Sequence, residues 1–222
     1  MGQHTQLTTQ DDFTLSAYQA LPEKDALGGI VILQEIFGVN AHVREVVDGY
    51  AELGYAAIAP ALFDRLETGV ELDYNEDGIE RGLKLARQQL SIEHALIDIE
   101  AAAQQVKSHG SVATIGYCFG GFLSYLSACQ NNSVDCSIAY YGGGITNVLD
   151  QQPNKPVLFH FAEQDHSIPL SDVDKIKSAL PDSLFYIYPA DHGFNCNHRG
   201  AWHEESAVLA RDRTLEFLNL HF

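Results

Sequence analysis

Short apolar runs alternate with longer amphipathic stretches along almost the whole chain. Residues 29–33 are apolar without interruption, as expected of a strand buried on both faces, whereas residues 13–18 alternate between apolar and polar, as a half-exposed strand does. The same reasoning predicts further strands over residues 55–59, 112–117, 134–141, 156–161 and 183–188. Helical periodicity predicts helices over residues 40–53, 92–106, 119–128, 172–180 and 201–220, with another that ends near residue 89.

This regular order of strands and helices is typical of an α/β protein. No repeat, low-complexity tract or Gly/Ser/Pro linker interrupts it, so we predict one domain over residues 1–222. The spacing favours a mostly parallel sheet with helices on both faces. Ligands of such sheets bind outside the carboxyl ends of the strands, so the segments that follow each strand are the places to look for chemistry.

The most informative of these segments is residues 116–121, Gly-Tyr-Cys-Phe-Gly-Gly, directly after a predicted buried strand. It fits the nucleophile-elbow pattern G-x-S-x-G with Cys118 in place of serine. In that pattern two small residues allow a sharp turn, and the following helix offers its N–H groups and its dipole to a developing oxyanion or a thiolate. The alternative is a glycine-rich turn that holds a buried cysteine without chemical function.

Two later strands are followed by an acid and a histidine. Asp165 follows the predicted strand 156–161, and His192 follows the strand 183–188. A carboxylate can orient an imidazole, and the order nucleophile, acid, histidine is the order that the α/β-hydrolase sheet uses. Each residue alone is explained as well by a surface turn or a structural histidine, and Glu163 is a local rival to Asp165.

A fourth segment follows the strand 29–33 and contains Glu35 and Ile36. The loop at this position of a hydrolase sheet normally supplies the second oxyanion N–H, which predicts the backbone N–H groups of Ile36 and Phe119 as the two donors. A carboxylate at the end of a buried strand needs a partner or a raised pKa. One explanation of Glu35 is therefore an ion pair with a nearby arginine such as Arg44.

Composition and charge exclude several classes of protein. Thirteen Lys and Arg residues face 30 Asp and Glu residues, which gives a net charge of −17 with the ten His residues counted as neutral. Binding to nucleic acid or to an anionic membrane needs a basic surface, so neither partner is predicted. Four cysteines without a C-x-x-C pair, a polar N-terminal segment and no long apolar run predict a cytoplasmic protein. We predict no cofactor and no metal.

The chain resembles the dienelactone hydrolase (carboxymethylenebutenolidase) family of the α/β-hydrolase fold. Besides residues 116–121, the shared segments are 34–40 (Gln-Glu-Ile-Phe-Gly-Val-Asn), 54–57 (Gly-Tyr-Ala-Ala), 140–142 (Tyr-Tyr-Gly), 164–166 (Gln-Asp-His), 192–194 (His-Gly-Phe) and 213–218 (Arg-Thr-Leu-Glu-Phe-Leu). The resemblance implies a triad of Cys118, His192 and Asp165, with Glu35 beside the thiol as a group that helps to deprotonate it. It also implies Tyr141 in the substrate site and the opening of an unsaturated lactone through an acyl-cysteine.

The chain departs from that family where two arginines hold the substrate carboxylate. Arg81 is the nearest match to one of them, and the position of the other is occupied by Cys196, with Arg199 nearby as a substitute. The net negative charge repels an anionic substrate. An anionic substrate therefore requires Arg81 or Arg199 beside Cys118, and otherwise a neutral lactone or ester is favoured.

Three other interpretations remain open. The same triad could cleave another small ester or a thioester. The domain could be a thiol-based binding or redox-sensing module that uses Cys118. The third is a metal site, since a short stretch contains several potential zinc ligands, although at no recognised spacing: His192, Cys196, His198, His203 and Glu204.

Overall fold

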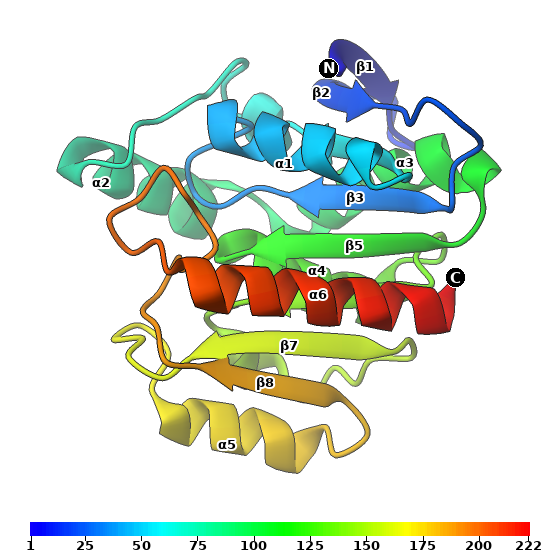
Figure 1. Ribbon diagram of the computed structural model, residues 1–222. Coiled ribbons are helices and arrows are strands. Elements are labelled where there is room, and N and C mark those ends of the chain that lie inside the picture. Colours follow the sequence, from blue (N-terminus) through cyan, green and yellow to red (C-terminus); the bar gives the residue numbers. More distant parts are fainter.

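The computed structural model describes all 222 residues, and its centre is one eight-stranded sheet (Figure 1). The strand order is β1-β2-β4-β3-β5-β6-β7-β8. The pairs β1–β2 and β2–β4 are antiparallel and all the others are parallel, which confirms the predicted fold class. The strands are β1 Gln3–Thr8, β2 Thr14–Ala20, β3 Gly29–Leu33, β4 Ala56–Pro60, β5 Val112–Tyr117, β6 Cys136–Tyr140, β7 Val157–Ala162 and β8 Leu184–Tyr188.

Helices cover both faces of the sheet. Helices α1 and α6 lie side by side on one face, and α3 and α4 lie behind the sheet (Figure 1). Their bounds are α1 Ala41–Glu52, α2 Glu76–Lys84, α3 Ile92–Val106, α4 Phe119–Gln130, α5 Leu170–Ala179 and α6 Glu204–His221. None of them combines the length and the apolar character that a bilayer crossing requires.

The termini of the predicted elements agree with the structure to within a few residues. Helix α1 begins after Asn40, whose side chain accepts a hydrogen bond from the N–H of Val43, and the chain leaves it through Gly54 at a φ of 100°. The sequence did not predict strand β1. It is an edge strand whose residues are mostly exposed, with only Leu7 buried, so it lacks the apolar periodicity on which the prediction depends.

A buried hydroxyl network fixes the part of the sheet that carries the predicted nucleophile. The Thr114 hydroxyl on β5 lies 2.8 Å from the hydroxyls of both Ser124 on α4 and Ser137 on β6. Ser124 also donates to the carbonyl of Ile138 at 2.9 Å. All three side chains are fully buried, so each hydrogen bond is made away from water and an alternative packing would leave a hydroxyl unpaired. The start of α4 is therefore held against β5 and β6.

Candidate active site

Cys118 lies at a sharp turn between strand β5 and helix α4. Its backbone has φ 54° and ψ −114°, a region that non-glycine residues rarely adopt, and its N–H donates to the carbonyl of Tyr140 at 3.0 Å. Strain of this kind persists only where the surrounding structure enforces it, and it is concentrated at functional sites. The half-exposed thiol stands at the amino end of α4, where N–H groups and the helix dipole favour negative charge.

The glycines on either side of the turn have no room for a side chain. A Cβ on Gly116 would lie 1.9 Å from the carbonyl oxygen of Gly120. A Cβ on Gly120 would lie 2.2 Å from the carbonyl oxygen of Leu33, at the end of β3. The close approach of α4 to β5 and β3 therefore depends on both glycines, which is the steric reason for the spacing in the motif.

We expect Gly116→Ala to lower the free energy of unfolding by about 3 kcal/mol, because the added methyl group must push the α4 backbone away from β5. The matched control is Gly49→Ala in α1, where a Cβ would meet no atom within 4 Å. That substitution should stabilise the protein by about 0.5–1 kcal/mol through helix propensity. Urea titrations of both variants measure the difference. Equal stabilities would show that the elbow can relax around a side chain.

The predicted acid and histidine meet at the ends of β7 and β8. Asp165 Oδ2 lies 2.7 Å from His192 Nδ1, and its Oδ1 accepts the backbone N–H groups of Ser167 and Ile168 at 2.8 and 3.1 Å. The carboxylate is thus buried with both oxygens bonded. Glu163, the local rival, is exposed and does not bond His192. Of the two acids, the structure therefore places only Asp165 in contact with the imidazole.

His192 lies between this carboxylate and Cys118. Burial alone would lower the pKa of His192, but the neighbouring Cys118 sulfur and the Asp165 carboxylate outweigh it and raise the pKa to about 10. The ring of Tyr141 also packs against His192, and the two ring centroids are 5.1 Å apart. The structure therefore brings the predicted nucleophile, histidine, acid and substrate-site tyrosine together at one edge of the sheet, as the parallel topology requires.

Glu35 is buried beside this group and is paired with Arg199. Its side chain is 3 % exposed, and Oε1 accepts a hydrogen bond from Arg199 Nη1 at 2.8 Å. Burial raises the pKa of Glu35, against the opposing effects of Arg199 and His192. The expected pairing with Arg44 is wrong, because that guanidinium bonds Glu71 and the carbonyl of Val39. The reason is topological: the segment after β8 brings Arg199 to the end of β3.

The second oxygen of Glu35 and the hydroxyl of Tyr141 are both buried without a hydrogen-bond partner. Tyr141 itself has a positive φ of 37°. Unpaired buried polar atoms are uncommon in proteins, and a catalytic role is one explanation for them. Burial raises the pKa of the Tyr141 hydroxyl, and the neighbouring Glu35 carboxylate acts in the same direction.

The Arg199 guanidinium lies near two aromatic rings whose role the sequence does not predict. Its guanidinium carbon lies 5.7 and 5.8 Å from the ring centroids of Phe37 and Tyr74, and its side chain is 20 % exposed. A Cβ on Gly193 would lie 2.6 Å from Arg199 Nη1. The φ of Gly193 is 85°, which favours glycine, and a side chain at this position would also require the Arg199 guanidinium to shift. Tyr74 lies in an acidic segment without hydrophobic periodicity, so the sequence pattern does not predict its contact with Arg199.

The two predicted oxyanion donors come from segments that pack closely. Phe119 begins α4, and a Cβ on the next residue, Gly120, would lie 2.2 and 2.6 Å from the carbonyl oxygens of Leu33 and Gln34, which directly precede Glu35 and Ile36. The assignment of the Ile36 and Phe119 N–H groups to an oxyanion stays a prediction.

The remaining residues that the sequence singled out are Arg81, Cys196 and the potential zinc ligands after β8. Arg81 is half-exposed and bonds the exposed Glu67 at 2.6 Å, so its role in substrate binding stays a prediction. Cys196 is buried close to Glu35, and burial raises the pKa of its thiol to about 11. The local set of potential zinc ligands after β8 does not converge: only His198 belongs to a group of ligand atoms, and its partners come from α1.

A parallel sheet with a strained cysteine elbow, followed by an acid and a histidine at later strand ends, defines the α/β-hydrolase class of the fold. The dienelactone hydrolase family model matches residues 15–222. Carboxymethylenebutenolidases from Pseudomonas putida and Pseudomonas knackmussii are each 35 % identical, with 96 % of this chain and 94 % of theirs covered. The chain belongs to the dienelactone hydrolase family, and it is a hydrolase of carboxylic esters or lactones.

Solved structures agree with this assignment. A crystal structure from Klebsiella pneumoniae, of a protein provisionally assigned as a dienelactone hydrolase, superposes with a TM-score of 0.88 at 29 % identity and covers 99 % of this chain and 98 % of that one. An esterase from Thermogutta terrifontis, 15 % identical with a TM-score of 0.67 over 97 % of this chain and 94 % of its own, shares the fold alone.

Proposed function

We propose that Cys118, His192 and Asp165 form a catalytic triad that hydrolyses a small lactone or ester through an acyl-cysteine. The observation that carries the proposal is the 2.7 Å contact of Asp165 with His192 Nδ1, on a ring whose other side faces the thiol of the elbow. The Cys118 sulfur attacks the carbonyl carbon, and the N–H groups of Ile36 and Phe119 bind the oxyanion. Each of these hydrogen bonds stabilises the transition state by about 3 kcal/mol. No cofactor is needed for these steps.

His192 serves both halves of the reaction. Its raised pKa gives it a proton at neutral pH, which it donates to the leaving oxygen as the carbonyl reforms. The neutral ring then takes a proton from the water that attacks the acyl-cysteine, and the thiolate leaves. Asp165 holds the ring in one orientation throughout and stabilises its cationic form.

The substrate class follows from the charge of the pocket. Arg199 is a largely buried guanidinium in a protein of net charge −17, and its neighbours, Glu35 first and Cys118 among the others, raise its pKa against the effect of burial. A guanidinium binds carboxylates with two parallel hydrogen bonds. This position supports a substrate that carries a carboxylate, as an unsaturated lactone of the dienelactone type does.

Glu35 couples substrate binding to the nucleophile in this proposal. A substrate carboxylate that binds Arg199 competes with Glu35 for the same guanidinium. The released Glu35 is a buried carboxylate whose pKa is already raised by burial, so it takes the proton of the Cys118 thiol and returns it to the thiolate once the product has left. Its unpartnered Oε2 is the atom free to accept that proton.

A comparison of two arginine variants tests the substrate assignment. We expect Arg199→Gln to raise KM for an unsaturated lactone with a free carboxylate by about 10- to 100-fold, the worth of a charged hydrogen bond. The methyl ester of the same compound should be affected much less. The matched control is Arg87→Gln, whose exposed guanidinium is not a candidate for substrate binding and whose loss should leave both substrates unchanged. Equal losses for the acid and its methyl ester in Arg199→Gln would disprove a carboxylate contact.

A further inference from the structure

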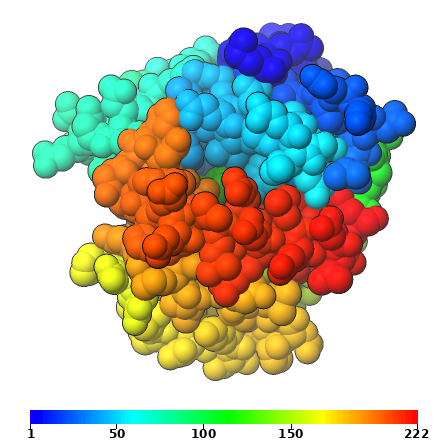
Figure 2. All heavy atoms as spheres, viewed as in Figure 1, coloured from blue at the N-terminus to red at the C-terminus, as the bar shows by residue number.

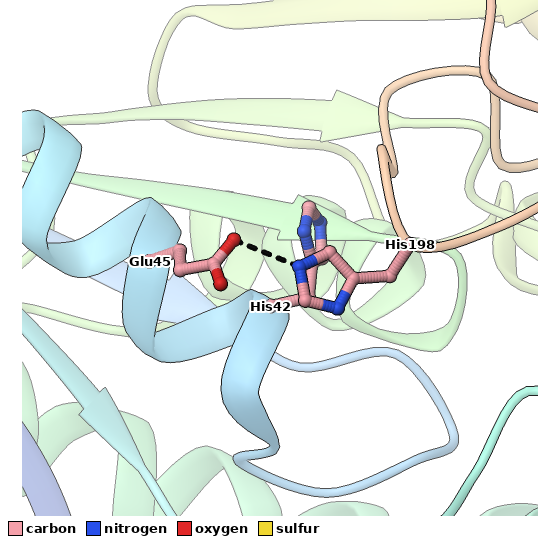
Figure 3. A group of neighbouring side chains, drawn as sticks. All are labelled: His42, Glu45 and His198. Atoms are coloured by element: carbon pink, nitrogen blue, oxygen red, sulfur yellow. Dashed lines mark hydrogen bonds and ion pairs between the residues drawn. The ribbon is translucent and has the colours of Figure 1, made fainter.

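We propose that His42, Glu45 and His198 form a binding site for a divalent transition-metal ion of the Zn²⁺ class (Figure 3). One ligand atom from each side chain lies within 4.8 Å of the other two. His42 and Glu45 are one turn apart on α1, and His198 comes from the segment between β8 and α6. The site is separate from the proposed triad, and the proposal does not depend on the proposed function.

The three side chains already approach one another as ligands of one ion would. Glu45 Oε2 lies 2.8 Å from His198 Nε2, and the ring centroids of His42 and His198 are 5.4 Å apart (Figure 3). Zn²⁺ binds imidazole nitrogen and carboxylate oxygen at about 2.0–2.2 Å. Glu45 and His198 already touch, so closing the group around an ion needs both side chains to rotate toward His42 and make room for the ion between them. Both side chains are partly exposed, which leaves space for this rotation.

An outer contact supports His42 as a ligand. Its Nδ1 lies 3.1 Å from the side-chain oxygen of Asn197, next to His198 in the chain. Histidines that bind metals nearly always use their other ring nitrogen in a hydrogen bond to a carbonyl or carboxylate, which fixes the orientation of the ring. A structural histidine in a core has no need of partners arranged in this way around a second imidazole and a carboxylate.

The site also has space beside it. His42, Glu45 and Asn197 line a cavity of about 370 Å³ between α1 and α6, and Figure 2 shows the surface hollowed between these two helices. Three protein ligands would leave the fourth position of a tetrahedral ion to water or to a small ligand from this cavity. Two imidazoles and one carboxylate suit Zn²⁺ better than Mg²⁺ or Ca²⁺, which prefer oxygen ligands.

A bound ion would join α1 to the segment that contains His192 and Arg199. The test is a calorimetric titration with Zn²⁺ of chelator-treated full-length protein, in the Cys118→Ala background so that the elbow thiol cannot bind the ion. We expect one Zn²⁺ per chain and a rise of the thermal midpoint on binding. Glu45→Gln and His198→Gln should each weaken binding by about 100-fold or more and remove the shift of the midpoint.

His94→Gln is the matched control, since His94 is an exposed histidine on α3 outside the group. It should bind Zn²⁺ as tightly as the Cys118→Ala parent. The substituted side chains are partly exposed, and circular dichroism checks that each variant is folded. Absence of saturable binding in the parent, or binding that survives both Glu45→Gln and His198→Gln, would overturn the proposal. In either case Glu45 and His198 form only a surface ion pair.

Discussion

The Cys118→Ala protein should hydrolyse lactones and esters slower than the wild type by a factor on the order of 10⁵ or more. The substitution removes the only thiol at the elbow and with it the covalent intermediate. The residual rate would come from the Ile36 and Phe119 N–H groups and from substrate binding alone, as it does when the nucleophile of a serine triad is removed. Steady-state kinetics on an unsaturated lactone and on an activated ester measure the effect.

Cys129→Ala is the control for this experiment. Cys129 lies near the end of α4, its thiol donates to the carbonyl of Tyr125, and burial raises its pKa to about 11. Its loss should leave kcat unchanged. A complementary measurement is mass spectrometry of the wild type mixed with substrate and quenched in acid, which should show the acyl group on Cys118. Full hydrolysis by Cys118→Ala would refute the nucleophile assignment.

The second large effect is expected for His192→Gln, with a loss of about 10⁴-fold in kcat. Glutamine can occupy the space of the imidazole but cannot transfer a proton. In the wild type, kcat should fall as the pH rises through about 10, because the proton that His192 gives to the leaving oxygen is lost there. This alkaline decline should be absent from the residual activity of His192→Gln.

His166→Gln is the matched control, since His166 is exposed in the segment after β7, one residue from Asp165. It should keep both kcat and the pH profile of the wild type. The double variant Cys118→Ala/His192→Gln provides a further test. The effects of substituting residues that act as a unit do not add up, so the double variant should be no slower than Cys118→Ala. Additive losses would mean that the cysteine and the histidine work in separate steps or separate sites.

The main part of the fold could be predicted because its strands are buried and separated by well-marked helices. The run 29–33 and the helix 92–106 appear in the structure with the predicted bounds, as β3 and α3. Buried parallel strands are apolar along their whole length, so uninterrupted apolar runs in the sequence show where they lie. The edge strand β1 has no such pattern. Its place is set by antiparallel hairpin pairing with β2, which depends on backbone hydrogen bonds and leaves no apolar periodicity in β1 itself.

The candidate site could be predicted only where it follows from strand ends. Cys118, Asp165 and His192 each come directly after a strand of a parallel sheet, so topology alone brings them together. The contact of Glu35 with Arg199 spans 164 positions and depends on the path of an irregular segment, for which there is no periodic signal. The same holds for His198, whose neighbours His42 and Glu45 are on α1.

The close packing of Gly193 links the proposed histidine to the proposed anion-binding arginine. Gly193 has a φ of 85°, which favours glycine, and a Cβ there would lie 2.6 Å from Arg199 Nη1. A side chain at this position would strain the backbone next to His192 and press on the guanidinium at the same time. A single substitution at position 193 should therefore change proton transfer and substrate binding together, so these two properties cannot vary independently through this position.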